Sequence, residues 1–182
     1  MTISSTRDAG TSTTTRVADI GLLILRVGIG AAALQAGLIK AFDFSAAVGF
    51  MESAGWRLPS LAAFMVTAAE TLGGLGLIFG VLTPLAACAV LAAMVDAWAV
   101  NVSTTAFWSE PFNVPFLIGL GAAALLFTGA GAYSVDAKVL GRNTWSAKIA
   151  LALLAVAFAA AVLTWISLYG VNPIHFTEPT QR

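Results

Sequence analysis

Hydrophobic residues dominate five long segments of the chain, and polar residues gather in the stretches between them. The five segments are residues 17–41, 60–80, 83–100, 114–130 and 147–169. A helix of about 20 apolar residues crosses the hydrocarbon core of a bilayer, so each segment predicts one transmembrane helix. Gly80 and Pro84 indicate a tight turn, because glycine often ends a helix and proline often begins one. The predicted fold class is all-α, a polytopic membrane helical bundle.

The polar stretches complete this organisation. Residues 1–16 are rich in Ser and Thr and predict a disordered tail, residues 139–146 form a linker, and residues 170–182 form a second tail. Loops on the cytoplasmic side of a membrane are enriched in Lys and Arg. With the N-terminus inside, the inner side carries five basic residues and the outer side three. We therefore expect a cytoplasmic N-terminal tail and linker, and an external C-terminal tail.

The connection between the first two spans, residues 42–59, has a pattern of its own. Its apolar residues recur at helical spacing opposite polar ones, and they are Ala46, Ala47, Phe50, Met51 and Ala54. Amphipathic helices of this kind lie in the membrane interface. We predict a short interfacial helix here, and a packed loop is the alternative.

Composition narrows the possible functions. Hydrophobic residues make up 59% of the chain and charged residues 10%, against about 45–50% and 25% in soluble domains, which excludes a water-soluble monomer. The net charge is zero, so no nucleic-acid partner is expected. Cys88 is the one cysteine and His175 the one histidine. We therefore expect no haem, iron–sulfur cluster or metal on this chain alone, and no catalytic residue can be assigned.

Three ionisable residues lie within the predicted spans: Arg26, Glu70 and Asp96. A charge at the bilayer centre costs at least about 2.5 kcal/mol, so each is expected to face the bundle and to have a partner. Arg26 is nine residues into the first span and Glu70 ten into the second. Counted in this way, both lie near mid-membrane, which predicts an ion pair between them. Asp96 falls in the outer half.

The first span carries a polar stripe that reaches the same outer half. Helical spacing places Arg26, Gly37 and Lys40 on one face, with Gln35 beside it. Lys40 lies at a depth where Asp96 or Glu52 would reach it. These groups either fix the register of the helices or form a polar site that suits a quinone head group or a proton path. The candidate residues of such a site are Arg26, Gln35, Gly37, Lys40, Glu70, Asp96 and Trp98.

Several short motifs occur together and in order along residues 20–138. They are Leu25-Arg26-Val27-Gly28, Gly37-Leu38-Ile39-Lys40, Gly55-Trp56-Arg57-Leu58-Pro59, a Glu-x-x-Gly-Gly that begins at Glu70, and a Gly-x-Gly-x-Tyr-Ser-x-Asp that ends at Asp136. In this set the sequence resembles the DoxX family of bacterial membrane proteins. The resemblance implies a four-helix membrane core, here residues 17–138, to which residues 147–169 add a fifth, C-terminal transmembrane helix. It also implies a multi-pass protein of the bacterial plasma membrane.

The resemblance further implies a function. Some members of the family are small subunits of quinone-linked oxidoreductases, and one is described as joining soluble enzymes of oxidative-stress defence at the membrane. Arg26, Lys40 and Glu70 are the matching positions that would form a common polar site.

Three functions follow from these observations. The first is an integral membrane subunit of a quinone-linked or oxidative-stress oxidoreductase complex, with no redox centre of its own and quinone as the one cofactor to consider. The second is a structural anchor that recruits a soluble oxidoreductase or other subunits. The third is a carrier of a small molecule or lipid, which the lack of an evident inverted repeat disfavours. The first and second make the chain a non-catalytic subunit rather than an enzyme.

Overall fold

The computed structural model describes residues 5–104 and 112–169, and within them the chain is helical throughout its regular structure. The elements are α1 (Ser5–Phe42), α2 (Phe44–Ser53), α3 (Pro59–Phe79), α4 (Thr83–Thr104), α5 (Val114–Thr128), α6 (Val135–Val139), α7 (Ala147–Thr164) and a π-helical turn, Trp165–Tyr169. The all-α bundle predicted from the apolar segments is confirmed. The short helix α6 was not predicted.

Four of the helices are long and apolar enough to cross a membrane, and their spans are Thr15–Phe42, Pro59–Phe79, Thr83–Val102 and Ala147–Leu168. The remaining apolar segment, residues 114–130, forms α5, which has 15 residues. At 1.5 Å per residue it is roughly 22 Å long, less than the ~30 Å of a bilayer core. The predicted segment of 114–130 is therefore a helix, but a shorter one than a full span.

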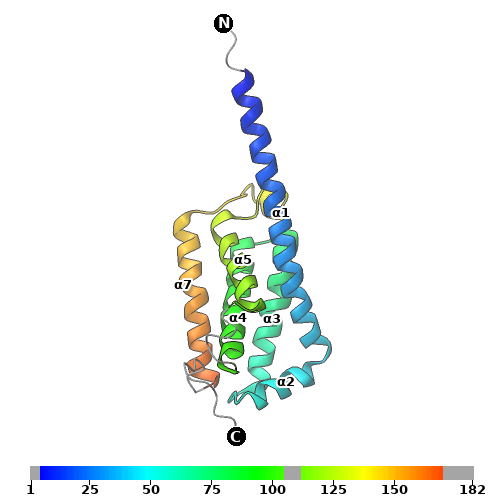
Figure 1. The fold of residues 1–182 in the computed structure, drawn as a ribbon, viewed down its shortest axis with the longest axis vertical. Helices are drawn as coiled ribbons and strands as arrows, with labels where there is room; N and C mark the ends of the chain where they lie inside the picture. The colour runs from blue at the N-terminus through cyan, green and yellow to red at the C-terminus, as the bar shows by residue number, and fades with distance from the viewer. Residues whose placement is uncertain (1–4, 105–111, 170–182) are drawn as a thin grey trace.

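The first helix is longer than the apolar pattern indicated. It begins at Ser5, so most of residues 1–16 continue the helix where the sequence pattern predicted a disordered tail. A helix that is already nucleated propagates at low cost, and the apolar span supplies that nucleus. As a result, the N-terminal part of α1 projects well beyond the other helices (Figure 1).

The bundle is arranged around α4, which packs against α3, α5 and α7. Helix α1 packs mainly on α3, and α7 lies at the opposite side of the bundle from α1 (Figure 1). The turn between α3 and α4 forms the predicted antiparallel hairpin, with Gly80 in the left-handed region at φ 66°. The core is made largely of small and branched residues, among them Ala33, Ala87, Val90 and Leu125, all fully buried.

The predicted helix between the first two spans is confirmed as α2. Asp43 caps it, because its carboxylate accepts a hydrogen bond from the backbone N–H of Ala46 at 3.0 Å and another from the Ser45 hydroxyl. These two bonds to the charged form lower the pKa of Asp43 below its ordinary value. Met51 anchors the helix against the bundle.

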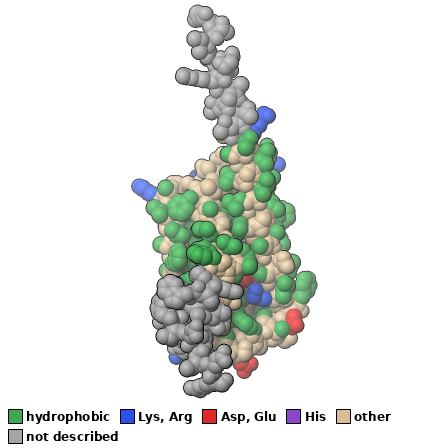
Figure 2. All heavy atoms as spheres, viewed as in Figure 1, with side chains coloured by type: hydrophobic (Ala, Val, Ile, Leu, Met, Phe, Trp, Pro, Cys, Tyr) green, Lys and Arg blue, Asp and Glu red, His purple; other side chains and the backbone are tan. Residues whose placement is uncertain are grey.

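The outer surface of the bundle is strongly apolar. Large side chains that would be buried in a soluble protein are exposed on every long helix, including Ile24, Leu72, Leu85, Leu120 and Leu163. Figure 2 shows hydrophobic side chains along the length of one face, with most charged side chains toward its ends. Such a surface is stable only against lipid.

The contact between α1 and α3 depends on glycines that lie between the two backbones. A Cβ atom on Gly30 would lie 2.8 Å from the carbonyl oxygen of Gly74, and one on Gly74 would lie 2.7 Å from that of Gly30. A Cβ atom on Gly37 would likewise lie 2.7 Å from the backbone nitrogen of Thr71. Gly28, on the exposed side of α1, has no atom within 4 Å of such a Cβ position.

We predict that Gly30→Ala lowers the stability of the protein and that Gly28→Ala does not. At Gly30 the new methyl group must push α1 and α3 apart, and overpacking of this kind costs about 1–3 kcal/mol. At Gly28 the same change removes a poor helix former and adds up to about 1 kcal/mol. Thermal unfolding of both variants in one mild detergent measures the difference, and equal melting temperatures would contradict the close contact.

Candidate functional site

A cavity of about 440 Å³ opens at the end of the bundle where α2 lies. Its wall is mostly apolar and comes from α1, α2, α3, α4, α5 and α7. The lining includes Ala36, Phe50, Met51, Trp56, Met65, Val66, Ala93, Met94, Val100, Ile118 and Ala160. Three charged side chains, Lys40, Glu70 and Asp96, reach the same space. Small-molecule sites in proteins have this character, an apolar pocket with a few convergent polar groups.

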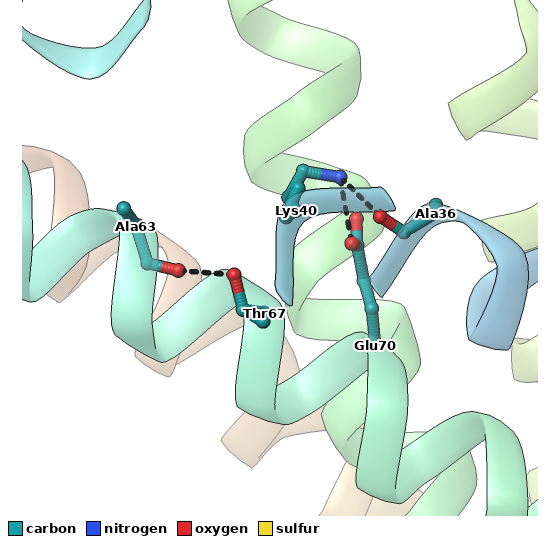
Figure 3. A network of polar contacts seen from close by, with 5 residues as sticks. All are labelled: Ala36, Lys40, Ala63, Thr67 and Glu70. Atoms are coloured by element: carbon teal, nitrogen blue, oxygen red, sulfur yellow. Dashed lines mark hydrogen bonds and ion pairs between the residues drawn. The ribbon is translucent and has the colours of Figure 1, made fainter. Parts of the chain in front are cut away.

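An ion pair forms one side of the cavity. The Lys40 ammonium donates to Glu70 Oε2 at 2.7 Å and to the carbonyl oxygen of Ala36 at 3.2 Å (Figure 3). The two partners differ in burial, since the Lys40 side chain is 28% exposed and that of Glu70 only 2%. Thr67, one turn before Glu70, takes no part, because its hydroxyl donates to Ala63 within α3.

The predicted ion pair between Arg26 and Glu70 is therefore wrong. The depth count allowed for the opposite directions of the two spans, but it assumed that their ends lie level in the membrane. The two helices are shifted along their axes relative to each other. Gly37 is five residues before the end of α1, whereas its neighbour Thr71 is twelve residues after the start of α3. Arg26 lies eleven residues before Gly37, or roughly 16 Å along the axis.

Arg26 instead holds the opposite end of the bundle together. It is 1% exposed, and its guanidinium donates to the carbonyl oxygens of Ala130 at 3.3 Å and Tyr133 at 2.6 Å. It also lies against the left-handed Gly80, where any side chain would collide with it. Its hydrogen bonds thus join α1 to the loop between α5 and α6.

The Gly-x-Gly-x-Tyr-Ser-x-Asp motif forms that loop, and Asp136 at its end is 1% exposed. The Asp136 carboxylate accepts from the backbone N–H groups of Leu82 at 2.7 Å and Thr83 at 2.8 Å. It therefore caps α4 and holds Leu82 in the left-handed region at φ 46°. Its negative charge also attracts the Arg26 guanidinium.

Asp96 lines the cavity but is not paired as the sequence predicted. Lys40 is engaged by Glu70, which leaves the predicted Lys40–Asp96 pair unformed. The Asp96 Oδ1 atom is buried and has no hydrogen-bond partner among the described residues. A buried acceptor without a donor is costly, so it marks a place where a ligand donor or a proton would be held.

The remaining candidates lie outside the cavity. The Gln35 side chain is exposed on the outer face of α1. Gly37 is buried in the crossing with α3, so it leaves no space for a head group. Trp98 lines a second hollow, which lies between α4, α5 and α7. Gln35 and Gly37 were placed by helical spacing and Trp98 by its depth near the outer boundary. Neither signal shows which helix lies against a given face.

Some cavity residues were missed as site residues by sequence reasoning. Phe50 and Met51 of α2 and Trp56 after it also line the cavity. The amphipathic pattern of residues 46–54 had located the inward face of α2. It did not show that this face covers the ion pair on the neighbouring helices.

The fold and this site together define a class: a polytopic helical membrane protein with a polar cavity between its helices. Residues 21–108 match the sequence model of the DoxX family, and the four long apolar helices are those of a multi-pass integral membrane protein. The Gly-x-Gly-x-Tyr-Ser-x-Asp motif and α7 follow the matched residues. No curated protein and no solved structure matches the chain.

We predict that the two partners of the ion pair respond unequally to substitution. Lys40→Met leaves a buried carboxylate unpaired, which costs about 3–5 kcal/mol, whereas Glu70→Met leaves an ammonium that is part exposed and still bonded to Ala36. The double variant regains part of the loss, because two apolar groups replace both charges. A double-mutant cycle of detergent melting curves tests this, and purely additive losses would contradict the pair.

At the other end we predict that Asp136→Asn destabilises the fold by about 1.5–3 kcal/mol, the range for hydrogen bonds to a charged group. The amide keeps the shape of the side chain but turns an N–H₂ group toward a backbone N–H. Asp43→Asn is the matched control, since Asn and Asp cap exposed helices about equally well. Equal melting temperatures of the two variants would show that Asp136 is not a structural cap.

Proposed function

We propose that this chain is the membrane subunit of a quinone-linked oxidoreductase complex and that its cavity holds the quinone ring. The observation that carries the proposal is the meeting of Lys40, Glu70 and Asp96 in an otherwise apolar cavity of about 440 Å³. A quinone ring is flat and apolar apart from two oxygens, so it needs this combination of surfaces. The match of residues 21–108 to the DoxX family model is consistent with this membrane setting.

Each polar group has a role in this proposal. The Lys40 ammonium, which already donates to Glu70, has a third N–H to offer to a quinone carbonyl. The Asp96 Oδ1 atom, which has no described partner, accepts a hydrogen bond from a hydroxyl of the reduced ring. Carboxylates beside the ring also exchange the protons that accompany quinone reduction.

The electrons must come from another protein, because Lys, Glu and Asp side chains carry protons but not electrons. In the proposal a partner subunit or a soluble oxidoreductase docks on the membrane protein and delivers them to the bound quinone. The chain itself supplies the ring-binding surface, the polar contacts to its oxygens and a path for protons. It is a subunit of the enzyme rather than the enzyme alone.

One observation favours a second function, the recruitment of soluble enzymes by a membrane scaffold. The N-terminal part of α1 stands clear of the bundle as a helical arm (Figure 1). Such an arm offers a surface to a soluble partner without any role for the cavity. In that case, loss of the arm would release the partner, and substitutions in the cavity would not.

The quinone proposal predicts that Asp96→Asn weakens quinone binding and that Glu52→Gln does not. Asn keeps an acceptor oxygen but cannot give up or take up a proton, so the change weakens one hydrogen bond to the ligand by about 0.5–1.5 kcal/mol, or roughly two- to twelvefold in the dissociation constant of a quinol. Glu52 is exposed on α2 and undergoes the same acid-to-amide change outside the cavity wall. Titration of the purified protein with a short-chain quinol, followed by tryptophan fluorescence, gives both constants.

Two results would contradict the proposal. The first is equal quinol affinity in the Asp96→Asn and Glu52→Gln proteins, with both folded to the same extent. The second is the absence of saturable binding by the unaltered protein. If a soluble oxidoreductase then co-purifies with the full chain and is lost when residues 5–14 are removed, the scaffold function is supported instead.

A further inference from the structure

A second hollow, of about 300 Å³, lies between α4, α5 and α7. Its wall carries aromatic and aliphatic side chains and no ionisable ones, and it includes Leu91, Val95, Trp98, Phe116, Leu120 and Phe158. Leu120 and Phe158 are about half exposed, at 59% and 48%, so the hollow opens to the lipid side of the bundle. We call it the tail groove.

The tail groove adjoins the cavity. Met94 and Pro115 line both spaces, so the two are separated by no more than these side chains. Met94 is 3% exposed, and its unbranched thioether has three rotatable bonds that let it fill or vacate a gap at little cost. A narrow passage beside Met94 would therefore make one continuous space.

The geometry of α4 explains why a polar space and an apolar one meet here. Ala93 and Asp96 project from one face of the helix into the cavity. Leu91, Val95 and Trp98 project from the adjacent face into the tail groove, at the i, i+4 and i+7 spacing of a helix face. One molecule that lies across the edge of α4 at Met94 would touch both faces.

We infer that the cavity and the tail groove bind one amphipathic lipid, a quinone with a hydrocarbon tail, with the ring beside Asp96 and the tail along Trp98 and Phe116. For the ring this rests on the proposed function; the placement of the tail rests on Met94 and Pro115, which line both spaces. The ligand then enters sideways from the bilayer, and its tail stays at the lipid-facing side throughout.

The tail contributes position more than affinity. A hydrocarbon chain that leaves lipid for the groove exchanges one apolar environment for another, so no hydrophobic transfer energy is gained. The tail therefore gains binding energy only from close packing against the rings of Trp98, Phe116 and Phe158. We therefore expect a tailed quinone to bind only about three- to tenfold more tightly than its ring alone.

Photolabelling locates the tail directly. The probes are a dimethoxy-methyl-benzoquinone without a tail and the same ring with a decyl chain that ends in a diazirine. The full chain is labelled in mild detergent, and the labelled peptides are identified by mass spectrometry. We expect label on the α4, α5 and α7 residues of the tail groove, removed by an excess of the tailless quinone.

A matched pair of variants sharpens the result. Ala123 lines the tail groove, and its neighbour Ala124 is exposed elsewhere on α5. We expect Ala123→Leu to displace the label and to weaken the tailed probe three- to tenfold without affecting the tailless one, and Ala124→Leu to do neither. Phe158→Ala, at a half-exposed position, is a second variant in case the first does not fold; it should remove label from α7.

The outcomes separate this inference from the proposed function. If the tailless quinone binds but the label falls on another hollow, such as that lined by Leu72 and Leu85 between α3 and α4, the tail placement is overturned and the ring site stands. The tail placement is also overturned if an excess of the tailless quinone does not reduce labelling of the tail groove. In that case the decyl chain of the probe binds there as any acyl chain would, without its ring in the cavity. If neither probe binds saturably, the ring site itself fails.

Discussion

The close approach of α1 and α3 is the contact on which the rest of this bundle depends. In lipid there is no hydrophobic drive to bring helices together, so association depends on close packing and on polar contacts. Gly30, Gly37 and Gly74 let the two backbones meet, and this fixes how far α3 is shifted along α1. That shift sets Lys40 beside Glu70 and Arg26 beside Gly80.

The two polar ends of the bundle use similar residue types for different purposes. At the α6 end, Arg26 and Asp136 are almost fully buried and are engaged with backbone groups of loops and helix ends. Such an arrangement joins loops and helix ends to one another. At the α2 end, the Lys40–Glu70 pair borders open space, and Asp96 has an acceptor without a described donor. The open space and the acceptor without a described donor therefore both lie at this second end.

Helix α7 contributes residues to the walls of both the cavity and the tail groove. It lies beyond the residues that match the DoxX model, yet Ala160 and Thr164 line the cavity and Phe158 lines the tail groove. A core without this helix would leave both spaces open on one side. The fifth apolar segment thus forms part of the wall of both spaces.

The sequence by itself determined the class of fold and the position of nearly every helix. Long apolar runs, a glycine and a proline at the hairpin turn, and the amphipathic period of residues 46–54 are local signals, and each predicts local structure without knowledge of its neighbours. The charged residues inside the spans likewise marked where polar contacts must occur, since their burial in lipid requires partners.

Only the tertiary structure decided which partners these are. Helical spacing assigns Arg26, Gly37 and Lys40 to one face of α1, but the shift between α1 and α3 follows from the packing of whole helices. As a result of that shift, Lys40 pairs with Glu70, and Gly37 lies against the backbone of α3. Gln35 and Trp98 lie outside the cavity. A pattern along one helix repeats every turn, so it cannot distinguish one register of α1 against α3 from another. The register is decided by the side chains and backbones that come into contact across the two helices.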